Sequence, residues 1–157
     1  MKIREAVKAA EKSKEVKELK QKGYFLNSGM GFLEPLDKEV VAWNLTYYNQ
    51  KANDVAQIVV DVDTVSLKEK GTPIHPTKQE LKLDDIKTTN DKMLEKARRE
   101  FKKYKQPVSQ IILSVQAEDG RAVWRINFIT KMFYLITVKL DAKTGELLSS
   151  DMHSLSK

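Results

Sequence analysis

The sequence predicts an α+β fold made of two tandem units, each with one helix packed on an antiparallel sheet of about three strands. Two observations lead to this prediction. Residues 123–141 contain two segments of alternating apolar and polar residues, the pattern of a β-hairpin, and residues 41–63 hold a looser copy. A Lys-rich segment with helical periodicity precedes each copy. A chain of 157 residues suffices for one ordinary domain or two small ones.

Residues 2–22 are expected to form the helix of the first unit. Its apolar residues recur at helical spacing and share one face: Ile3, Ala6, Val7 and Ala10. The stripe slips near Ser13, which indicates a bend or two short helices. Gly23 is a suitable stop because glycine adopts the left-handed conformation without a Cβ clash.

Three strands are expected in the first unit. Gly29 and Gly31 interrupt the large side chains of residues 24–33, which predicts an irregular strand there. Residues 41–48 and 55–63 alternate more regularly.

A linker is expected at residues 67–80, which contain two prolines and no periodicity. This linker divides the chain into a first unit at 1–66 and a second unit at 81–157. The alternative is that both units form one compact, pseudo-symmetric domain.

The second unit begins with a helix that ends before Pro107. Alternation at residues 111–115 predicts its first strand. The sequence Glu-Asp-Gly-Arg at 118–121 predicts the turn that leads into the hairpin at 123–141. The polar residues 149–157 are expected to fray.

Trp43 and Trp124 lie early in the first hairpin strand of the two copies. Their positions match the apolar face that the helix covers, which favours core tryptophans over binding aromatics.

The net charge of +6 is concentrated on the two predicted helices. Lys and Arg clusters attract phosphates, so nucleic-acid or anionic-surface binding is the alternative function. Several of these cations lie three or four residues from a Glu, as Glu95 does from Arg98 and Arg99, which favours a solvated, ion-paired helix surface.

The sequence contains no apolar run long enough for a membrane span and no secretory signal, so we expect a cytoplasmic protein. The alternative is an extracytoplasmic domain whose signal or anchor has been removed. The sequence contains no cysteine, which excludes disulfides and thiolate metal sites.

We expect neither an enzyme nor a cofactor. The two histidines, His75 and His153, do not form a helical metal-binding pair, and no metal site is predicted. The Gly29-x-Gly31 sequence lacks the Lys-Ser/Thr of a phosphate loop, and no Gly-x-Ser-x-Gly nucleophile motif occurs.

The sheet faces that the helices leave open are the candidate binding surface. Their side chains mix polar and apolar types, which predicts that they are partly buried against each other, in a homodimer or under a ligand. The candidate residues are Asn44, Thr46, Tyr48, Gln57, Val59, Asp61, Ile112, Arg125, Asn127, Ile129, Leu135 and Thr137. The expected partner is a protein or peptide, including a second copy of the chain, bound by these faces or by sheet edges.

The segment Val-Lys-Leu-Asp-Ala-Lys-Thr-Gly-Glu-Leu-Leu at 138–148 resembles the closing strand and turn of PepSY domains, where a strand typically ends in Asp-Ala-x-Thr-Gly-Glu and an aliphatic residue. Residues 43–48 and 60–63 are similar to the same element. The resemblance implies tandem cystatin-like modules that are not enzymes and often lie outside the cytoplasm. It also implies a protein-binding or inhibitory role, as proposed for such modules in propeptides of thermolysin-type proteases.

Overall fold

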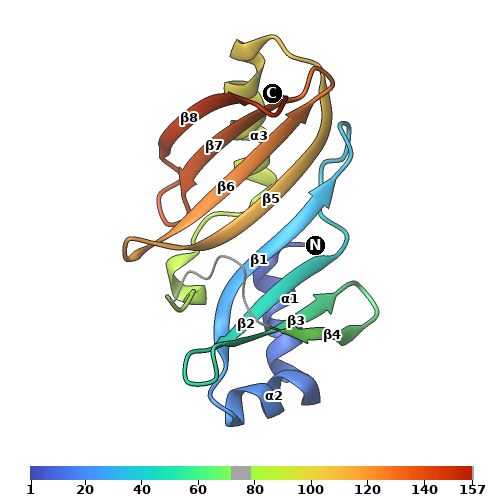
Figure 1. Cartoon of the computed structure of the whole chain (residues 1–157), viewed down its shortest axis with the longest axis vertical. Helices are drawn as coiled ribbons and strands as arrows, with labels where there is room; N and C mark the ends of the chain where they lie inside the picture. The colour runs from blue at the N-terminus through green and yellow to red at the C-terminus, as the bar shows by residue number, and fades with distance from the viewer. Residues whose placement is uncertain (72–78, 157) are drawn as a thin grey trace.

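One antiparallel sheet runs through the molecule in the order β4-β3-β2-β1-β5-β6-β7-β8 (Figure 1). This is a computed structural model, and it describes residues 1–71 and 79–156. The strands on one side of the centre are β1 (Phe25–Leu33), β2 (Trp43–Asn49), β3 (Asp54–Val60) and β4 (Val65–Gly71). Those on the other side are β5 (Val108–Glu118), β6 (Arg121–Thr130), β7 (Tyr134–Asp141) and β8 (Leu147–Ser154).

The prediction of two tandem units, each with a helix on its own sheet, is therefore wrong. The tandem cystatin-like repeat that the PepSY resemblance implied is wrong for the same reason. β1 and β5 pair antiparallel, with Gly29 opposite Val115 and Gly31 opposite Leu113. This pairing joins the strands of both halves into one sheet. Each half also contributes four strands, one more than the sequence indicated.

The missing strands lie in segments whose sequences are polar. Residues 67–71 of the predicted linker belong to β4, and most of the C-terminal segment that we expected to fray is β8. Residues 72–78 of the predicted linker lie outside the described residues. Edge strands often carry charged and polar residues that discourage pairing with another chain, so their sequences can resemble those of loops.

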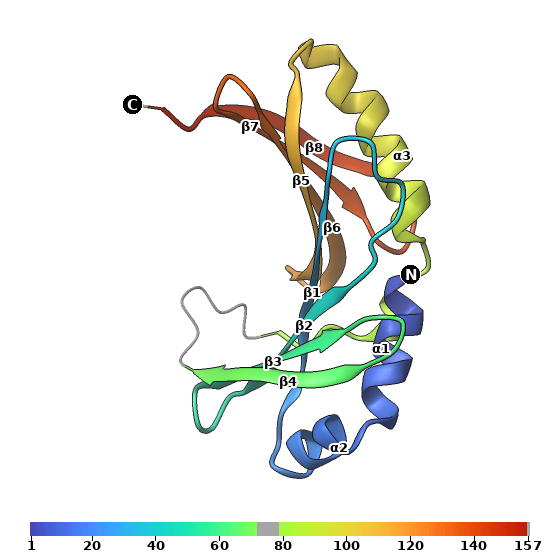
Figure 2. The same ribbon diagram turned by 90° about the vertical axis from the view of Figure 1, so that its right-hand side faces the viewer.

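Helices α1 (Ile3–Lys12), α2 (Lys14–Gln21) and α3 (Asn90–Phe101) all lie on one face of the sheet (Figure 2). Two single-turn 3-10 helices, Leu83–Asp85 and Lys102–Tyr104, flank α3. The predicted apolar stripe of α1 is buried, and the slip near Ser13 is a break between α1 and α2. The Ser13 hydroxyl accepts the Val16 N–H at 3.2 Å and so caps α2.

Gly29 and Gly31 are required by close packing on the helix-covered face of β1. A Cβ on Gly29 would lie 2.8 Å from Ile3 Cδ1, and one on Gly31 would lie 2.6 Å from Val40 Cγ1. β1 is therefore a regular central strand apart from one bulge between Leu26 and Ser28.

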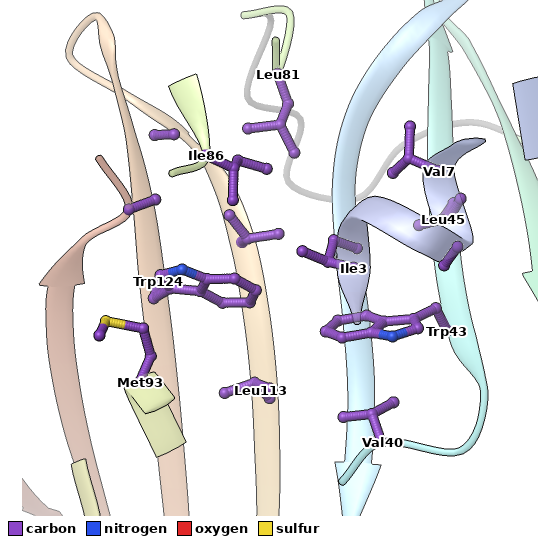
Figure 3. Packing of buried hydrophobic residues seen from close by; sticks show 14 of the residues in the cluster. Ile3, Val7, Val40, Trp43, Leu45, Leu81, Ile86, Met93, Leu113 and Trp124 are labelled. Atoms are coloured by element: carbon purple, nitrogen blue, oxygen red, sulfur yellow. The ribbon is translucent and has the colours of Figure 1, made fainter. Parts of the chain in front are cut away.

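Trp43 and Trp124 meet at the centre of the core, with ring centroids 6.3 Å apart (Figure 3). Both side chains are fully buried, which confirms that they are core residues. Each indole N–H has an acceptor: the Met1 carbonyl at 3.1 Å for Trp43 and the Thr88 hydroxyl at 2.9 Å for Trp124. The core is one cluster that contains residues of both halves.

Candidate binding face of the sheet

The sheet face opposite the helices is covered by no element in the described part of the chain (Figure 2). It is one continuous face, because the two halves share one sheet. Strand register decides which side chains lie side by side on it.

An apolar strip crosses the centre of this face from β1 to β7. We call it the open-face strip, and it consists of Met30, Phe32, Ile112, Ile129 and Leu135. Phe32 is opposite Ile112, and Ile129 is opposite Leu135. Ile112 faces Asn127, which places Ile129 on the diagonal two residues further along β6. Met30 and Phe32 are 40% and 48% exposed, so the strip is accessible.

The turn between β6 and β7 extends the apolar surface beside the strip. Met132 and Phe133 are 64% and 65% exposed, and Phe133 has a positive φ of 63°. The turn is held by hydrogen bonds, because the Phe133 N–H donates to the Thr130 carbonyl and the Tyr134 N–H to the Thr130 hydroxyl.

A charged cluster lies on the same face at the other end of β5–β7. The Glu118 carboxylate lies 3.3 Å from the Arg125 guanidinium and 3.4 Å from the Lys139 ammonium. Burial alone would raise the pKa of Glu118, but the charges of Arg125 and Lys139 and the hydrogen bonds from Arg125 and Gln116 outweigh burial, and the pKa is lowered. The face is thus apolar near the β6–β7 turn and ionic near the β5–β6 turn.

Six of the predicted binding residues lie together on β5–β7. They are Ile112, Arg125, Asn127, Ile129, Leu135 and Thr137. The Thr137 hydroxyl donates to the Asn127 side chain at 2.7 Å, so this polar pair separates the apolar strip from the charged cluster.

The other six predicted residues lie on or beside β2 and β3, on the far side of β1. They are Asn44, Thr46, Tyr48, Gln57, Val59 and Asp61. Thr46 and Gln57 hydrogen-bond to each other. Tyr48 is only 1% exposed and packs edge-on against Phe25, so it offers no open surface.

Asp61 stabilises the turn between β3 and β4. Its carboxylate accepts the N–H groups of Asp63 at 2.8 Å and Thr64 at 2.7 Å, and these backbone bonds lower its pKa. Asp141 does the same between β7 and β8, where it accepts the N–H groups of Lys143 and Thr144. Both carboxylates therefore act as turn residues.

Sequence reasoning missed Met30, Phe32 and Glu118. The β1 pattern was available, because small residues at 29 and 31 alternate with large ones at 30 and 32, which is the signature of a strand crowded on one face. Glu118 was assigned to the turn, but the turn itself is Asp119-Gly120, with φ of 50° and 81°. Glu118 closes the turn opposite Arg121, with its side chain turned toward Arg125.

Four basic side chains of α3 and of the 3-10 helix that follows it make contacts within the chain. Arg98 donates to the carbonyls of Pro35 and Asp37, and Lys96 donates to the Gly145 carbonyl. Arg99 and Lys103 pair with Glu95 and Glu100, one helical turn away.

Metal-binding side chains do not converge in residues 1–71 and 79–156, where no group of three or more His, Asp or Glu could hold an ion. His153 is exposed on β8. His75 lies outside the described residues.

A hollow of about 720 Å³ separates α3 from the segment that follows β1. Its walls mix apolar side chains, such as Leu36 and Leu94, with charged ones, including Asp91 and Arg98. Arg98 fixes one wall through its two carbonyl contacts.

Comparisons with known proteins establish likeness of fold alone. No protein-family model and no curated protein matches the sequence. Among solved structures, the chain resembles the crystal structure of a "putative lipoprotein" from Clostridium difficile 630, with a TM-score of 0.57 and 18% sequence identity. The match covers 88% of this chain and 89% of the clostridial one. No helix in the described part of this chain is both long and apolar enough to cross a membrane.

Proposed function

We propose that this protein is a non-enzymatic binding module that holds a protein or peptide segment on the open-face strip. The observation that carries the proposal is the exposure of Met30 and Phe32 in the middle of a sheet, next to Ile112 and with no covering element in the described chain. A central strand normally buries such side chains, because water contact of apolar area costs about 25 cal/mol per Å².

The layout of the face supports a segment with apolar anchors and a charged end. The strip would take two or three apolar side chains, and Glu118, Arg125 and Lys139 lie along the same strands. Interfaces of this kind derive affinity from a few apolar anchors and orientation from charges at the rim.

The proposal can be tested with a phage-displayed random peptide library selected on the immobilised full chain. Affinities of selected peptides are then measured by fluorescence anisotropy. Phe32→Glu should weaken binding at least tenfold, about 1.4 kcal/mol. The matched control is Leu36→Glu: Leu36 is 91% exposed and lies in the hollow beside α3, away from the strip, so binding should be unchanged. Peptides that bind both variants equally would contradict the proposal.

Nucleic-acid binding is the competing outcome of the same experiment. An oligonucleotide that binds with a steep salt dependence, and equally well to Phe32→Glu, would favour it. The contacts of Arg98 and Lys96 with backbone carbonyls occupy N–H donors that a phosphate would need, so we favour a protein or peptide.

The proposal also covers where the protein acts in the cell and whether it belongs to the PepSY family. No comparison supports the cytoplasmic expectation, and the name of the clostridial structure favours an extracytoplasmic setting, which fractionation of the source cells would test. Membership of the PepSY family, with the inhibitory role that it implies, stays a prediction.

A further inference from the structure

The two edges of the sheet differ in how well they are protected from pairing. β4 has the sequence Val-Ser-Leu-Lys-Glu-Lys-Gly, and an exposed lysine such as Lys68 on an edge strand discourages association. β8 has the sequence Leu-Leu-Ser-Ser-Asp-Met-His-Ser, in which Asp151 is the one carboxylate and no lysine occurs. β8 is therefore an open strand edge of low charge.

The backbone of β8 presents free hydrogen-bonding groups at regular positions. The Leu155 N–H donates to the Phe133 carbonyl at 2.7 Å, next to the Tyr134–Ser154 pair. Inward and outward groups alternate along an antiparallel strand, so the N–H and C=O of Ser150 and Met152 point away from β7.

Two exposed apolar side chains flank Ser150 along β8. Met152 is opposite the core residue Ile136, and Leu148 lies in a bulge beside Leu147, the residue opposite Leu140. Leu148 and Met152 are 37% and 43% exposed. They lie two residues before and two residues after Ser150.

We propose that β8 pairs antiparallel with β8 of a second copy of this chain, about a two-fold axis through Ser150. This register places Met152 opposite the partner's Leu148, and Leu148 opposite the partner's Met152, which covers both exposed side chains. Asp151 then faces the partner's Ser149. A register centred on Asp151 would instead bring two carboxylates face to face, which is unfavourable.

The two-fold axis of an antiparallel strand pair is perpendicular to the sheet. The helices of both copies therefore lie on one side, and both open-face strips lie on the other side of one continuous sheet. A single strand pair is a small interface, so the dimer forms reversibly and depends on concentration. Pairing of β8 with a second copy does not require a peptide on the open-face strip.

The first test is sedimentation of the full chain over a range of concentrations. The mass should rise from the 18.0 kDa of one chain toward twice that value. Met152→Pro removes an outward N–H without disturbing the ladder to β7, so it should shift dimerisation to at least tenfold higher concentration. Met152→Leu keeps both the N–H and an apolar side chain, and should dimerise like the wild type.

The second test uses the absence of cysteine in the sequence. Ser150→Cys places one thiol per chain at the axis, where directly opposite Cα atoms are about 5.5 Å apart, within disulfide range. Oxidation should give a covalent dimer, whereas Ser66→Cys on the opposite edge strand β4 should not. If Met152→Pro does not fold, the cross-linking test still shows whether β8 pairs with β8 of a second copy. A wild type that stays monomeric at all concentrations, or a dimer that Ser150→Cys fails to cross-link, would overturn the proposal.

Discussion

Gly31 occupies a position where no side chain can be accommodated without moving a buried neighbour. A Cβ there would lie 2.6 and 2.8 Å from the two methyl carbons of Val40, which is 1% exposed. We expect Gly31→Ala to lower the free energy of unfolding by about 1–3 kcal/mol, measured by urea unfolding.

The control for this prediction is Gly71→Ala, since a Cβ at Gly71 meets no atom within 4 Å. Its effect should stay within about 0.5 kcal/mol. In a double-mutant cycle, Gly31→Ala should cost less in the Val40→Ala background than in the wild type, because the truncated Val40 no longer clashes. Equal stability of Gly31→Ala and the wild type would disprove the close-packing explanation.

Glu118 should make stability depend on pH. Its pKa is lower in the folded protein than the ordinary value of 4.5, so the unfolded chain binds more protons as the solution is acidified. The contribution of Glu118 is therefore complete above about pH 4.5 and is lost as the pH falls through the folded pKa. In urea unfolding between pH 7 and pH 3, the stability difference between the wild type and Glu118→Gln should shrink below pH 4.5. A difference that stays constant over this range would contradict the prediction.

The local spacing of apolar residues correctly predicted that both tryptophans are buried and where one helix ends. The parity of Trp43 and Trp124 placed both in the core, and the slip near Ser13 marked the break between α1 and α2. These inferences needed only local spacing. The exposure of Phe32 needed the partners of β1, which sequence spacing does not give.

α3 organises the segment after β1 through a single side chain. Arg98 donates to the Pro35 carbonyl at 2.7 Å and also to the Asp37 carbonyl. Arg98→Ala should lower stability by about 1–2 kcal/mol, since hydrogen bonds from charged donors are stronger than neutral ones. Faster hydrogen exchange of residues 34–42 would report the released segment.

The neighbouring Arg99 provides the matched control for Arg98. Arg99 pairs with Glu95 on the same helix, and both side chains are largely exposed, at 66% and 72%. Arg99→Ala should therefore change stability by less than about 0.5 kcal/mol. Similar effects of the two substitutions would mean that Arg98 does not hold the segment.

The two edge strands, β4 and β8, were not predicted from the sequence. β4 and β8 lack the apolar alternation that marked the inner strands, because most of their described side chains are exposed instead of packed in the core. The turns that precede these strands are easier to recognise in the sequence. Asp61 and Asp141 each accept backbone N–H groups in the turn before the edge strand.

The halves of the molecule are joined in more places than the β1–β5 pairing. The Ile3 N–H at the start of α1 donates to the Asn90 side chain at the start of α3, at 2.9 Å, and Arg4 donates to the carbonyls of Leu83 and Ile86. These partners are about 80 residues apart in sequence. Two units with separate sheets were predicted because such long-range contacts leave no periodic signal in a single sequence.

One shared sheet and one shared core predict that the halves unfold together. Trp43 reports on the first half and Trp124 on the second, so Trp124→Phe and Trp43→Phe each leave one indole as a local probe. Both substitutions weaken the core, but within each variant the fluorescence midpoint in urea should coincide with the midpoint from far-ultraviolet circular dichroism. Independent units would instead give two dichroism transitions, of which each indole reports only one. Coincident midpoints in one variant and separated midpoints in the other would show that one half retains structure alone, which the continuous core does not allow.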